Sequence, residues 1–362
     1  MSQAATLSIC IATMNRAKFI GATLDSIISQ VTEEVEIVIV DGASTDGTGD
    51  VVARYQERCS TLRYYRLGEK GGVDQDYCRA VDLATGQYCW LFTDDDIMKP
   101  GAINAVLSAI RDDYGLVIVN AEVRNEDLSA LLEERSIRTA TNKHYASGET
   151  DALFVDAVNL LSFIGCVVIR RSIWDARDKT SYYGTVFVHV GVIFQAPLPE
   201  RALVLAEPWV AIRYGNALWT PKSFEISTVK WPTLLWSFSS VSEAAKQKVT
   251  GRDPWDSVTA LLIYRARAAL SATEYHQLLR PRIRSSTRRM VIRTIVALPG
   301  CPLNTLLLIY MAVFGWRHSQ RGIRLVDLRK SRFYYKQVLA ELVGRTTRAR
   351  RRTRWFAPEN NR

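Results

Sequence analysis

Residues 88–101 read Tyr88-Cys89-Trp90-Leu91-Phe92-Thr93-Asp94-Asp95-Asp96-Ile97-Met98-Lys99-Pro100-Gly101. The first five are apolar or aromatic, which predicts a buried strand, and Pro100-Gly101 ends it, so that three acids lie on a loop after the strand. Adjacent carboxylates repel one another unless solvent or a cation takes up their charge, and hard divalent ions prefer such oxygen ligands. In open α/β sheets this carboxyl edge is where ligands bind. Taken alone, the triplet is equally consistent with a solvated acidic turn.

The chain before this triplet alternates between strand and helix patterns. The expected strands are 7–12, 35–40, 62–67 and 88–92, and the expected helices are 17–30, 49–58 and 74–84. Asn15 is expected to be the N-cap of the first helix. This alternation predicts an α/β fold, a mostly parallel sheet with helices on both faces. The loops after its strands would bring Thr13, Asp41 and the acidic triplet to one edge.

Such a collection of aspartates, hydroxyls and glycines suits a nucleotide whose phosphates are held through a metal ion. The sequence contains neither G-x-x-x-x-G-K-[ST] nor G-x-G-x-x-G, so a P-loop and a dinucleotide fingerprint are excluded. Several segments, together with the acids, resemble the family 2 glycosyltransferases of GT-A fold over about residues 5–110. These segments are Ser8-Ile9-Cys10-Ile11-Ala12-Thr13-Met14-Asn15-Arg16, Ile37-Val38-Ile39-Val40-Asp41-Gly42-Ala43-Ser44-Thr45-Asp46-Gly47-Thr48, Gly71-Gly72-Val73 and Ala84-Thr85-Gly86-Gln87-Tyr88.

The resemblance implies roles for individual residues. Asp41 occupies the position that contacts the nucleobase, and Thr13 a position that contacts the nucleotide. The acids occupy the position of the D-x-D metal motif, with Asp95 and Asp96 as the expected ligands of Mg²⁺ or Mn²⁺ and Asp94 reaching the ribose. Thr93 replaces the usual leading aspartate, so which of the three acids bind the ion stays open. The other residues expected at the nucleotide sugar are Asn15, Arg16, Ser44, Asp46, Gly71, Gly72, Asp74 and Asp76.

The helix after Gly72 departs from the family pattern. Many members carry an Ala-Arg-Asn triplet there, whereas this chain has Asp76-Tyr77-Cys78. The spacing Asp74-x-Asp76 is similar to that of the branch that adds dideoxyhexoses such as abequose to lipid-linked O-antigen units. The resemblance therefore implies an acceptor that is a lipid-linked oligosaccharide or another cell-surface glycan.

The catalytic base is harder to assign. In the family an acidic pair begins a helix after a strand like 163–171, but the corresponding residues 183–195 contain no carboxylate. His189 is the group in this segment that accepts a proton near neutral pH. A lone histidine among apolar neighbours is more often a hydrogen-bonded core residue, but its position in the family pattern keeps both interpretations open. The fallback candidates are Asp175, Asp178, Glu149 and Asp151. Farther along, Arg213 could pair with phosphate oxygens and Trp219 could stack on a sugar, and either could equally be structural.

Charge divides the 362 residues unevenly. Residues 1–200 carry 18 Lys and Arg against 28 Asp and Glu, whereas residues 201–362 carry 29 against 9. We expect a catalytic domain over 1–222 and a basic helical extension over 223–362 that faces an anionic partner. The six cysteines form no C-x-x-C pair and mostly lie in apolar runs, which predicts reduced thiols. No signal peptide is apparent, so the expected compartment is the cytoplasm or its membrane face.

The extension contains 23 uncharged residues, Thr294 to Trp316, between two arginines. Pro299-Gly300-Cys301-Pro302 interrupts them, and the remaining Leu303–Trp316 is too short to cross a bilayer. We expect an interfacial or re-entrant helix, with a buried helix as the alternative. A further amphipathic helix is expected over 326–342. A polybasic tail, Arg345 to Arg354, is typical of binding to anionic lipid; a nucleic-acid partner is not expected, because no DNA- or RNA-binding module accompanies it.

The resemblance implies an inverting, metal-dependent glycosyltransferase, and the basic extension predicts that it is bound peripherally or monotopically at the cytoplasmic face of the inner membrane. Two alternatives stay open on sequence alone. One is a sugar-phosphate nucleotidyltransferase, although Thr13-Met14-Asn15-Arg16 does not supply its glycine-rich basic loop. The other is a non-catalytic membrane- or nucleic-acid-binding protein built on a decayed transferase domain, which the missing acidic pair suggests.

Overall fold

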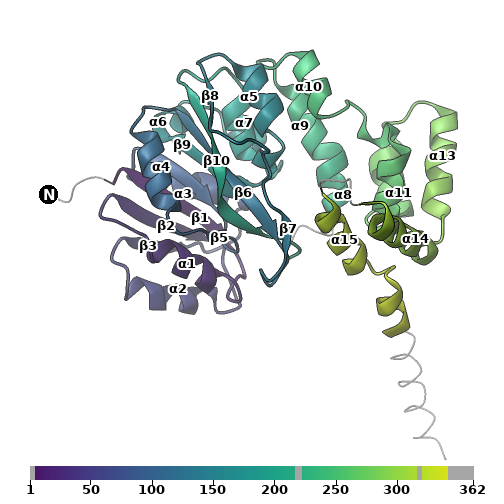
Figure 1. Cartoon of the computed structure of the whole chain (residues 1–362), viewed down its shortest axis with the longest axis horizontal. Coiled ribbons are helices and arrows are strands. Elements are labelled where there is room, and N and C mark those ends of the chain that lie inside the picture. Colours follow the sequence, from purple (N-terminus) through teal and green to yellow (C-terminus); the bar gives the residue numbers. More distant parts are fainter. Residues whose placement is uncertain (1–4, 217–221, 316–319, 341–362) are drawn as a thin grey trace, which may run out of the picture. The chain divides into compact units, whose positions relative to one another are not determined.

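The computed structural model describes residues 5–216, 222–315 and 320–340, and these form two compact units. The first unit contains residues up to Asn216 and the segment Lys230–Arg252; the second contains the other described residues. The boundary predicted between residues 222 and 223 thus differs from this grouping, because 230–252 belong with the first unit. Figure 1 shows the elements of both units along the chain.

The first unit is built on one ten-stranded sheet. Its longest path runs β3-β2-β1-β4-β9-β6-β10-β5, with β7 beside β6 and β8 beside β10. The strands are β1 Leu7–Thr13, β2 Val35–Asp41, β3 Leu62–Arg66, β4 Tyr88–Phe92, β5 Ile97–Met98, β6 Leu116–Arg124, β7 Leu131–Glu133, β8 Lys143–Tyr145, β9 Val167–Arg170 and β10 Ala202–Arg213. β3, β2, β1 and β4 are parallel, and β9 is antiparallel to both β4 and β6. The mostly parallel α/β sheet is therefore confirmed.

Helices pack around this sheet, with α1 and α2 side by side (Figure 1). The helices of the first unit are α1 Ile20–Ile28, α2 Thr48–Gln56, α3 Val73–Leu83, α4 Ala102–Ile110, α5 Thr150–Ala157, α6 Arg171–Asp175, α7 Val188–Phe194, α9 Trp231–Ser237 and α10 Glu243–Val249. All seven residues of β2 and all five of β4 are buried, because strands covered on both faces need continuous apolar runs. The register pairs Thr13 with Asp41, so the loops after β1 and β2 leave the sheet together.

The expected start of the first helix is wrong. The helix begins at Ile20 with Phe19 as its N-cap, and Asn15 lies outside it with a positive φ of 56°. Asparagine tolerates this left-handed conformation better than most residues. Its backbone N–H donates to Ser44 Oγ (2.8 Å) and its Oδ1 accepts the N–H of Thr45 (2.8 Å). Asn15 therefore joins the loops after β1 and β2.

The second unit is helical. Its helices are α8 Ser223–Glu225, α11 Val258–Ala266, α12 Ala272–Glu274, α13 Ser286–Ala297, α14 Gly300–Val313 and α15 Arg321–Lys330. The helix expected over 326–342 is interrupted: α15 begins earlier and ends at Lys330, where Ser331 is extended and its hydroxyl donates to the carbonyl of Ala266. Residues 335–340 are helical again, and 341–342 lie outside the described residues. Across the described residues no single helix could span a membrane; α13 and α14 together have the length and composition, but they meet at 90°.

Candidate active site

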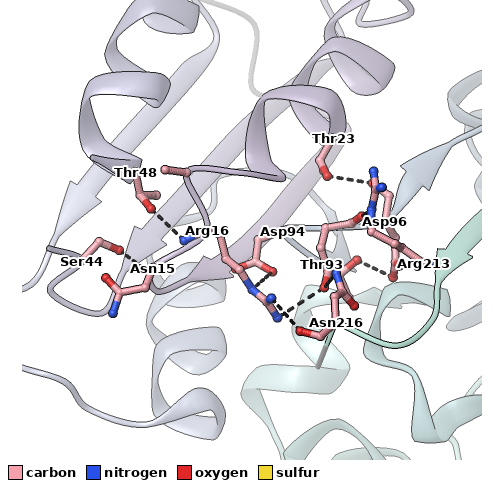
Figure 2. A network of polar contacts seen from close by, with 12 residues as sticks. Asn15, Arg16, Thr23, Ser44, Thr48, Thr93, Asp94, Asp96, Arg213 and Asn216 are labelled. Atoms are coloured by element: carbon pink, nitrogen blue, oxygen red, sulfur yellow. Dashed lines mark hydrogen bonds and ion pairs between the residues drawn. The ribbon is translucent and has the colours of Figure 1, made fainter. Parts of the chain in front are cut away.

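Two arginines, Arg16 and Arg213, lie beside the acidic loop after β4 (Figure 2). The guanidinium of Arg16 lies between two carboxylates, with Nε 3.3 Å from Asp94 Oδ1 and Nη2 3.3 Å from Asp95 Oδ2. Asn216 Nδ2 also donates to Asp95 Oδ2 at 2.9 Å, and Arg16 donates to the carbonyl of Asn216 at 3.2 Å. The carboxylates of Asp94 and Asp95 and the guanidinium of Arg16 thus share a nearly buried position at the carboxyl edge of the sheet.

Asp96 belongs to the same triplet but makes different contacts. Its Oδ2 accepts the hydroxyl of Thr93 at 2.6 Å and its Oδ1 accepts the backbone N–H of Arg213 at 2.7 Å. Its carbonyl accepts the hydroxyl of Thr23 at 2.8 Å (Figure 2). Both carboxylate oxygens of Asp96 are therefore engaged within the protein, whereas one oxygen of Asp94 and one of Asp95 meet Arg16.

Burial raises the pKa of all three aspartates. Taking a carboxylate out of water disfavours its charged form, and the charge of Asp95 raises the pKa of both neighbours further. Arg16 opposes this by lowering the pKa of Asp94 and of Asp95. Arg213 lowers the pKa of Asp95 as well. Two guanidinium groups thus lie beside three buried carboxylates, which leaves the loop deficient in positive charge.

That deficit fits a divalent cation. Mg²⁺ is commonly bound through one or two carboxylates and completed by substrate phosphates, and Arg16 already stands as the cation between Asp94 and Asp95. Among the described residues no three His, Cys, Asp or Glu side chains converge as a ready-made metal cage. The chemistry of Asp94 and Asp95 fits an ion only if a bound ligand completes its coordination. Asp96, expected as a ligand, has its oxygens hydrogen-bonded elsewhere.

The loops after β1 and β2 are tied together by short polar contacts (Figure 2). The backbone N–H of Arg16 donates to Thr48 Oγ1 at 2.8 Å, and Asp46 accepts the N–H of Ala17 at 3.0 Å. Asp46 also accepts the hydroxyl of Thr48 at 2.6 Å. Ser44 and Asp46, both expected at the nucleotide sugar, thus hold the loop that carries Arg16.

Asp41 ends β2 and is fully buried. Its Oδ1 accepts the N–H of Ser44 at 2.8 Å and its Oδ2 accepts the hydroxyl of Tyr64 at 2.5 Å. Both oxygens of the expected nucleobase contact thus have partners inside the protein. Tyr64 was not predicted as part of the site. It pairs with Ile39 in the register of β2 and β3, and no pattern in the sequence marks it.

Asp76 lies beside the same loops, and one of its two carboxylate oxygens lacks a partner in the described part of the chain. It is 5% exposed, and its Oδ1 accepts no hydrogen bond from the described residues. A Cβ at Gly71 would stand 2.8 Å from Oδ1 and one at Gly42 would stand 3.0 Å from Oδ2. Burial raises the pKa of Asp76 to about 6, and the charge of Asp41 raises it as well. The glycines therefore leave room above a buried acceptor that lacks a donor.

Asp74, on the same turn of α3, has a different position from the one expected. Its Oδ2 accepts the backbone N–H groups of Gly184 (2.8 Å) and Val186 (3.0 Å), and its Oδ1 accepts that of Val188 (3.1 Å). These contacts hold the loop that leads into α7. The carboxylate of Asp74 thus supports a protein loop, and both its oxygens are occupied.

His189 occupies a core position in α7. Its side chain is 1% exposed, and Nε2 lies 2.6 Å from the carbonyl of Leu161, so the proton resides on Nε2. Burial lowers the pKa of His189 to about 4. A base must reach its substrate, and this geometry instead supports the alternative of a hydrogen-bonded core histidine.

The fallback acids serve local structure. Asp178 accepts the backbone N–H and hydroxyl of Thr180, Asp151 accepts the N–H of Ser242, and Glu149 accepts that of Ala146. Asp175 is exposed and lies 4.0 Å from Arg171.

Arg213 and Asn216, at the end of β10, complete the wall of the acidic loop. Arg213 Nε donates to the carbonyl of Asp95 at 2.8 Å, and one amino group donates to the carbonyl of Glu126 at 2.7 Å. The predicted phosphate partner thus braces the loop. Asn216 was not predicted as a site residue. The one indication in the sequence is that it is a polar residue three positions after Arg213. Trp219 lies outside the described residues.

Comparisons with known proteins agree with this geometry. Residues 8–175 match the family described as glycosyl transferase family 2. The chain is 28% identical over 226 residues to abequosyltransferase RfbV of Salmonella typhimurium, covering 58% of this chain and 67% of that protein. It is 26% identical over 121 residues to a Campylobacter jejuni GalNAc(5)-diNAcBac-PP-undecaprenol β-1,3-glucosyltransferase, covering 33% of this chain and 39% of that one. For that relative the match spans about two fifths of its length.

A solved structure shares the fold. The crystal structure of S. aureus TarS 1–349 in complex with UDP aligns with a TM-score of 0.55 at 14% identity, over 90% of each chain. Residues 8–175 of this chain therefore form a glycosyl transferase family 2 domain, which with the named homologues supports a glycosyltransferase enzyme, and the fold is of the GT-A type.

Proposed function

We propose that the protein transfers a sugar from a nucleotide diphosphate donor to a hydroxyl of a lipid-linked oligosaccharide or another cell-surface glycan. The observation that carries this proposal is the pair Asp94 and Asp95 around Arg16, at the edge where the loops after β1 and β2 also end. The names of two relatives support the acceptor class: one is an abequosyltransferase, and the other names an undecaprenol-linked glycan.

Mg²⁺ or Mn²⁺ is the proposed cofactor, held by Asp95 together with Asp94, while Asp96 stays the alternative second ligand. Such an ion supplies positive charge that stabilises a departing diphosphate. Arg16 would serve the same end, because a guanidinium released from two carboxylates can pair with phosphate oxygens. Asp76 would accept a hydrogen bond from the bound nucleotide.

We also propose that the transfer inverts the anomeric carbon in one displacement. That reaction needs a group that accepts the acceptor's proton but no protein nucleophile. The sequence-derived candidate is His189, although its burial and lowered pKa speak against that role. The proposed location is the cytoplasmic face of the inner membrane, where the basic second part of the chain would meet anionic lipid.

Purified protein incubated with radiolabelled nucleotide sugars and bacterial membranes tests the proposal. We expect one donor to place label in the lipid or polysaccharide fraction, and EDTA to abolish this until Mn²⁺ is restored. We expect sugar 1-phosphate and nucleoside triphosphate to give no nucleotide sugar under the same conditions, which distinguishes the protein from a sugar-phosphate nucleotidyltransferase. If no donor transferred label to any of the membrane fractions, the proposed transferase activity would be contradicted.

A further inference from the structure

One face of α14 exposes only apolar side chains. Leu306, Ile309, Tyr310, Val313 and Phe314 have exposed fractions between 48% and 64%. Their spacing of three, four, seven and eight residues puts them on one side of a helix. This set is called the α14 stripe below. A contiguous exposed apolar patch on a soluble surface marks a contact with a partner or a membrane.

The opposite face of α14 is packed inside the second unit. Met311 is buried with Ala266 and Leu328, and Leu303, Leu307 and Leu308 pack against them. Asn304 on that face donates to the carbonyls of Ala266 and Leu328 at 3.1 Å and 2.9 Å. The helix is therefore fixed to α11 and α15, and the α14 stripe is presented outward by a rigid support.

Arginines lie at both ends of this helix. Arg321 donates to the carbonyl of Ala312 at 3.0 Å near its carboxyl end. Arg265 donates to the carbonyl of Leu298 at 2.7 Å just before its start. Two exposed arginines come earlier in the chain than α14: Arg284 lies before α13 and Arg293 lies on α13. An uncharged apolar face between cationic groups is the pattern of a helix that lies in the interface of an anionic bilayer.

We infer that the α14 stripe is the surface with which the second unit enters the headgroup region of anionic lipid, with the helix lying along the membrane. The inference rests on the proposed membrane location and adds the element that makes the contact. A protein partner of matching apolar shape would not account for arginines at both ends. A second copy of the chain would bring like charges together, which opposes dimerisation through this face.

The test uses sedimentation of the full chain with phosphatidylcholine vesicles, with and without phosphatidylglycerol. The variant carries Leu306→Gln, Ile309→Gln and Val313→Gln, which keep helix propensity and replace side chains that the fold does not bury. Val258→Gln, an exposed apolar residue on α11, is the matched control. Tm and donor-nucleotide binding show that each variant is folded.

We expect wild type and Val258→Gln to sediment with anionic vesicles. The triple variant should bind these vesicles at least about tenfold more weakly. Equal binding by the triple variant would overturn the role of the stripe while leaving the membrane location intact. Failure of the wild type to bind any vesicle would overturn both, and retained sugar transfer to a soluble acceptor would show that the transferase proposal survives. A wild-type dimer that the triple variant dissolves, measured by light scattering, would assign the face to a second copy instead.

Discussion

The backbone N–H of Arg213 donates to Asp96 Oδ1 at 2.7 Å, which ties the acidic loop after β4 to the end of β10. The hydroxyl of Thr93 donates a hydrogen bond to Oδ2, the other oxygen of the same carboxylate. Asp96 thereby shapes the loop, whereas Asp94 and Asp95 turn their charge toward Arg16. Neighbouring acids in one triplet consequently have separable tasks.

Asp95→Asn and Asp96→Asn should therefore fail in different ways. Removing the charge of Asp95 should lower kcat/KM by about 10²–10³-fold, because donor stabilisation is electrostatic, while unfolding free energy changes by less than about 1 kcal/mol. Asp96→Asn should cost about 1–3 kcal/mol of unfolding free energy, because an amide cannot accept both bonds. Steady-state kinetics over a range of Mn²⁺ concentrations and urea unfolding separate the two. A stable, inactive Asp96→Asn would instead make Asp96 the functional acid.

Asp76 should give nucleotide binding a pH dependence. Its carboxyl group accepts an N–H or hydroxyl much more strongly when it is ionised, and burial raises its pKa to about 6. Affinity for a nucleoside diphosphate should thus be full near pH 7 and fall roughly tenfold by pH 5, one unit below that pKa. Isothermal titration at pH 5, 6 and 7 measures this.

The Asp76→Asn variant should bind nucleoside diphosphate more weakly at pH 7 and show little change with pH. Asp82→Asn, an exposed position at the other end of α3, should behave as wild type. Inorganic diphosphate should bind wild type and Asp76→Asn equally, because it lacks the donor groups of base and ribose. An affinity that rises as the pH falls would mean that Asp76 acts as a protonated donor.

The sheet and the position of its acidic loop could be predicted from sequence because both depend on local patterns. Buried parallel strands such as β2 and β4 need continuous apolar runs, and polar residues directly after them must lie at one edge. The contacts of individual carboxylates could not be predicted in this way. Asp74 meets the backbone of residues 184–188, more than a hundred positions away, and no local pattern encodes such a pairing.

The partners of Asp41 and His189 illustrate the same limit. Alignment with a motif gives the position of a side chain, but the tertiary contacts decide whether its polar atoms remain available. Tyr64 and Ser44 occupy the oxygens of Asp41, and Leu161 fixes the imidazole of His189. Asp76 was one of eleven residues expected at the nucleotide sugar, and only its unpartnered Oδ1 in the structure distinguishes it from Asp74.

Asp74→Asn should loosen the loop that precedes α7. Three backbone N–H groups converge on the carboxylate of Asp74, and the amide would offer one oxygen and a misplaced donor. We expect a loss of about 2–3 kcal/mol in unfolding free energy and faster amide exchange at residues 184–188. Hydrogen exchange by mass spectrometry checks this, with Asp82→Asn as the control. Unchanged exchange in the loop would show that it is held by other contacts.

Glu36 should contribute stability that disappears in acid. Burial would raise its pKa, but the hydroxyl of Ser8, the N–H and hydroxyl of Thr85 and the charge of Arg63 hold the pKa of Glu36 below its usual value of 4.5. A lowered folded-state pKa means that the contribution is present above pH 4.5 and is lost as the pH falls through the lower value. Glu36→Gln should cost about 1–3 kcal/mol at pH 7 and less at pH 3. The exposed Glu34→Gln should show neither effect in the same urea titrations.

Two substitutions of His189 distinguish a catalytic base from a hydrogen-bonded core residue. Its Nε2 donates to the carbonyl of Leu161, a bond that glutamine can replace and alanine cannot. As a core residue, His189→Ala should lose about 2–4 kcal/mol of unfolding free energy, while folded His189→Gln keeps kcat within a few-fold. A catalytic base would instead cost about 10²–10⁴-fold in kcat in both variants.

The pH dependence of stability gives a readout independent of activity. Burial lowers the pKa of His189 to about 4 from an ordinary value of 6.5. Between these values the unfolded chain binds a proton that the folded chain does not, so wild-type stability should fall relative to His189→Gln as the pH drops from 6.5 to 4, by up to about 3 kcal/mol. Urea unfolding at several pH values measures the difference. A constant difference would mean that the imidazole is hydrated, and a hydrated imidazole would be able to take a proton from an acceptor hydroxyl.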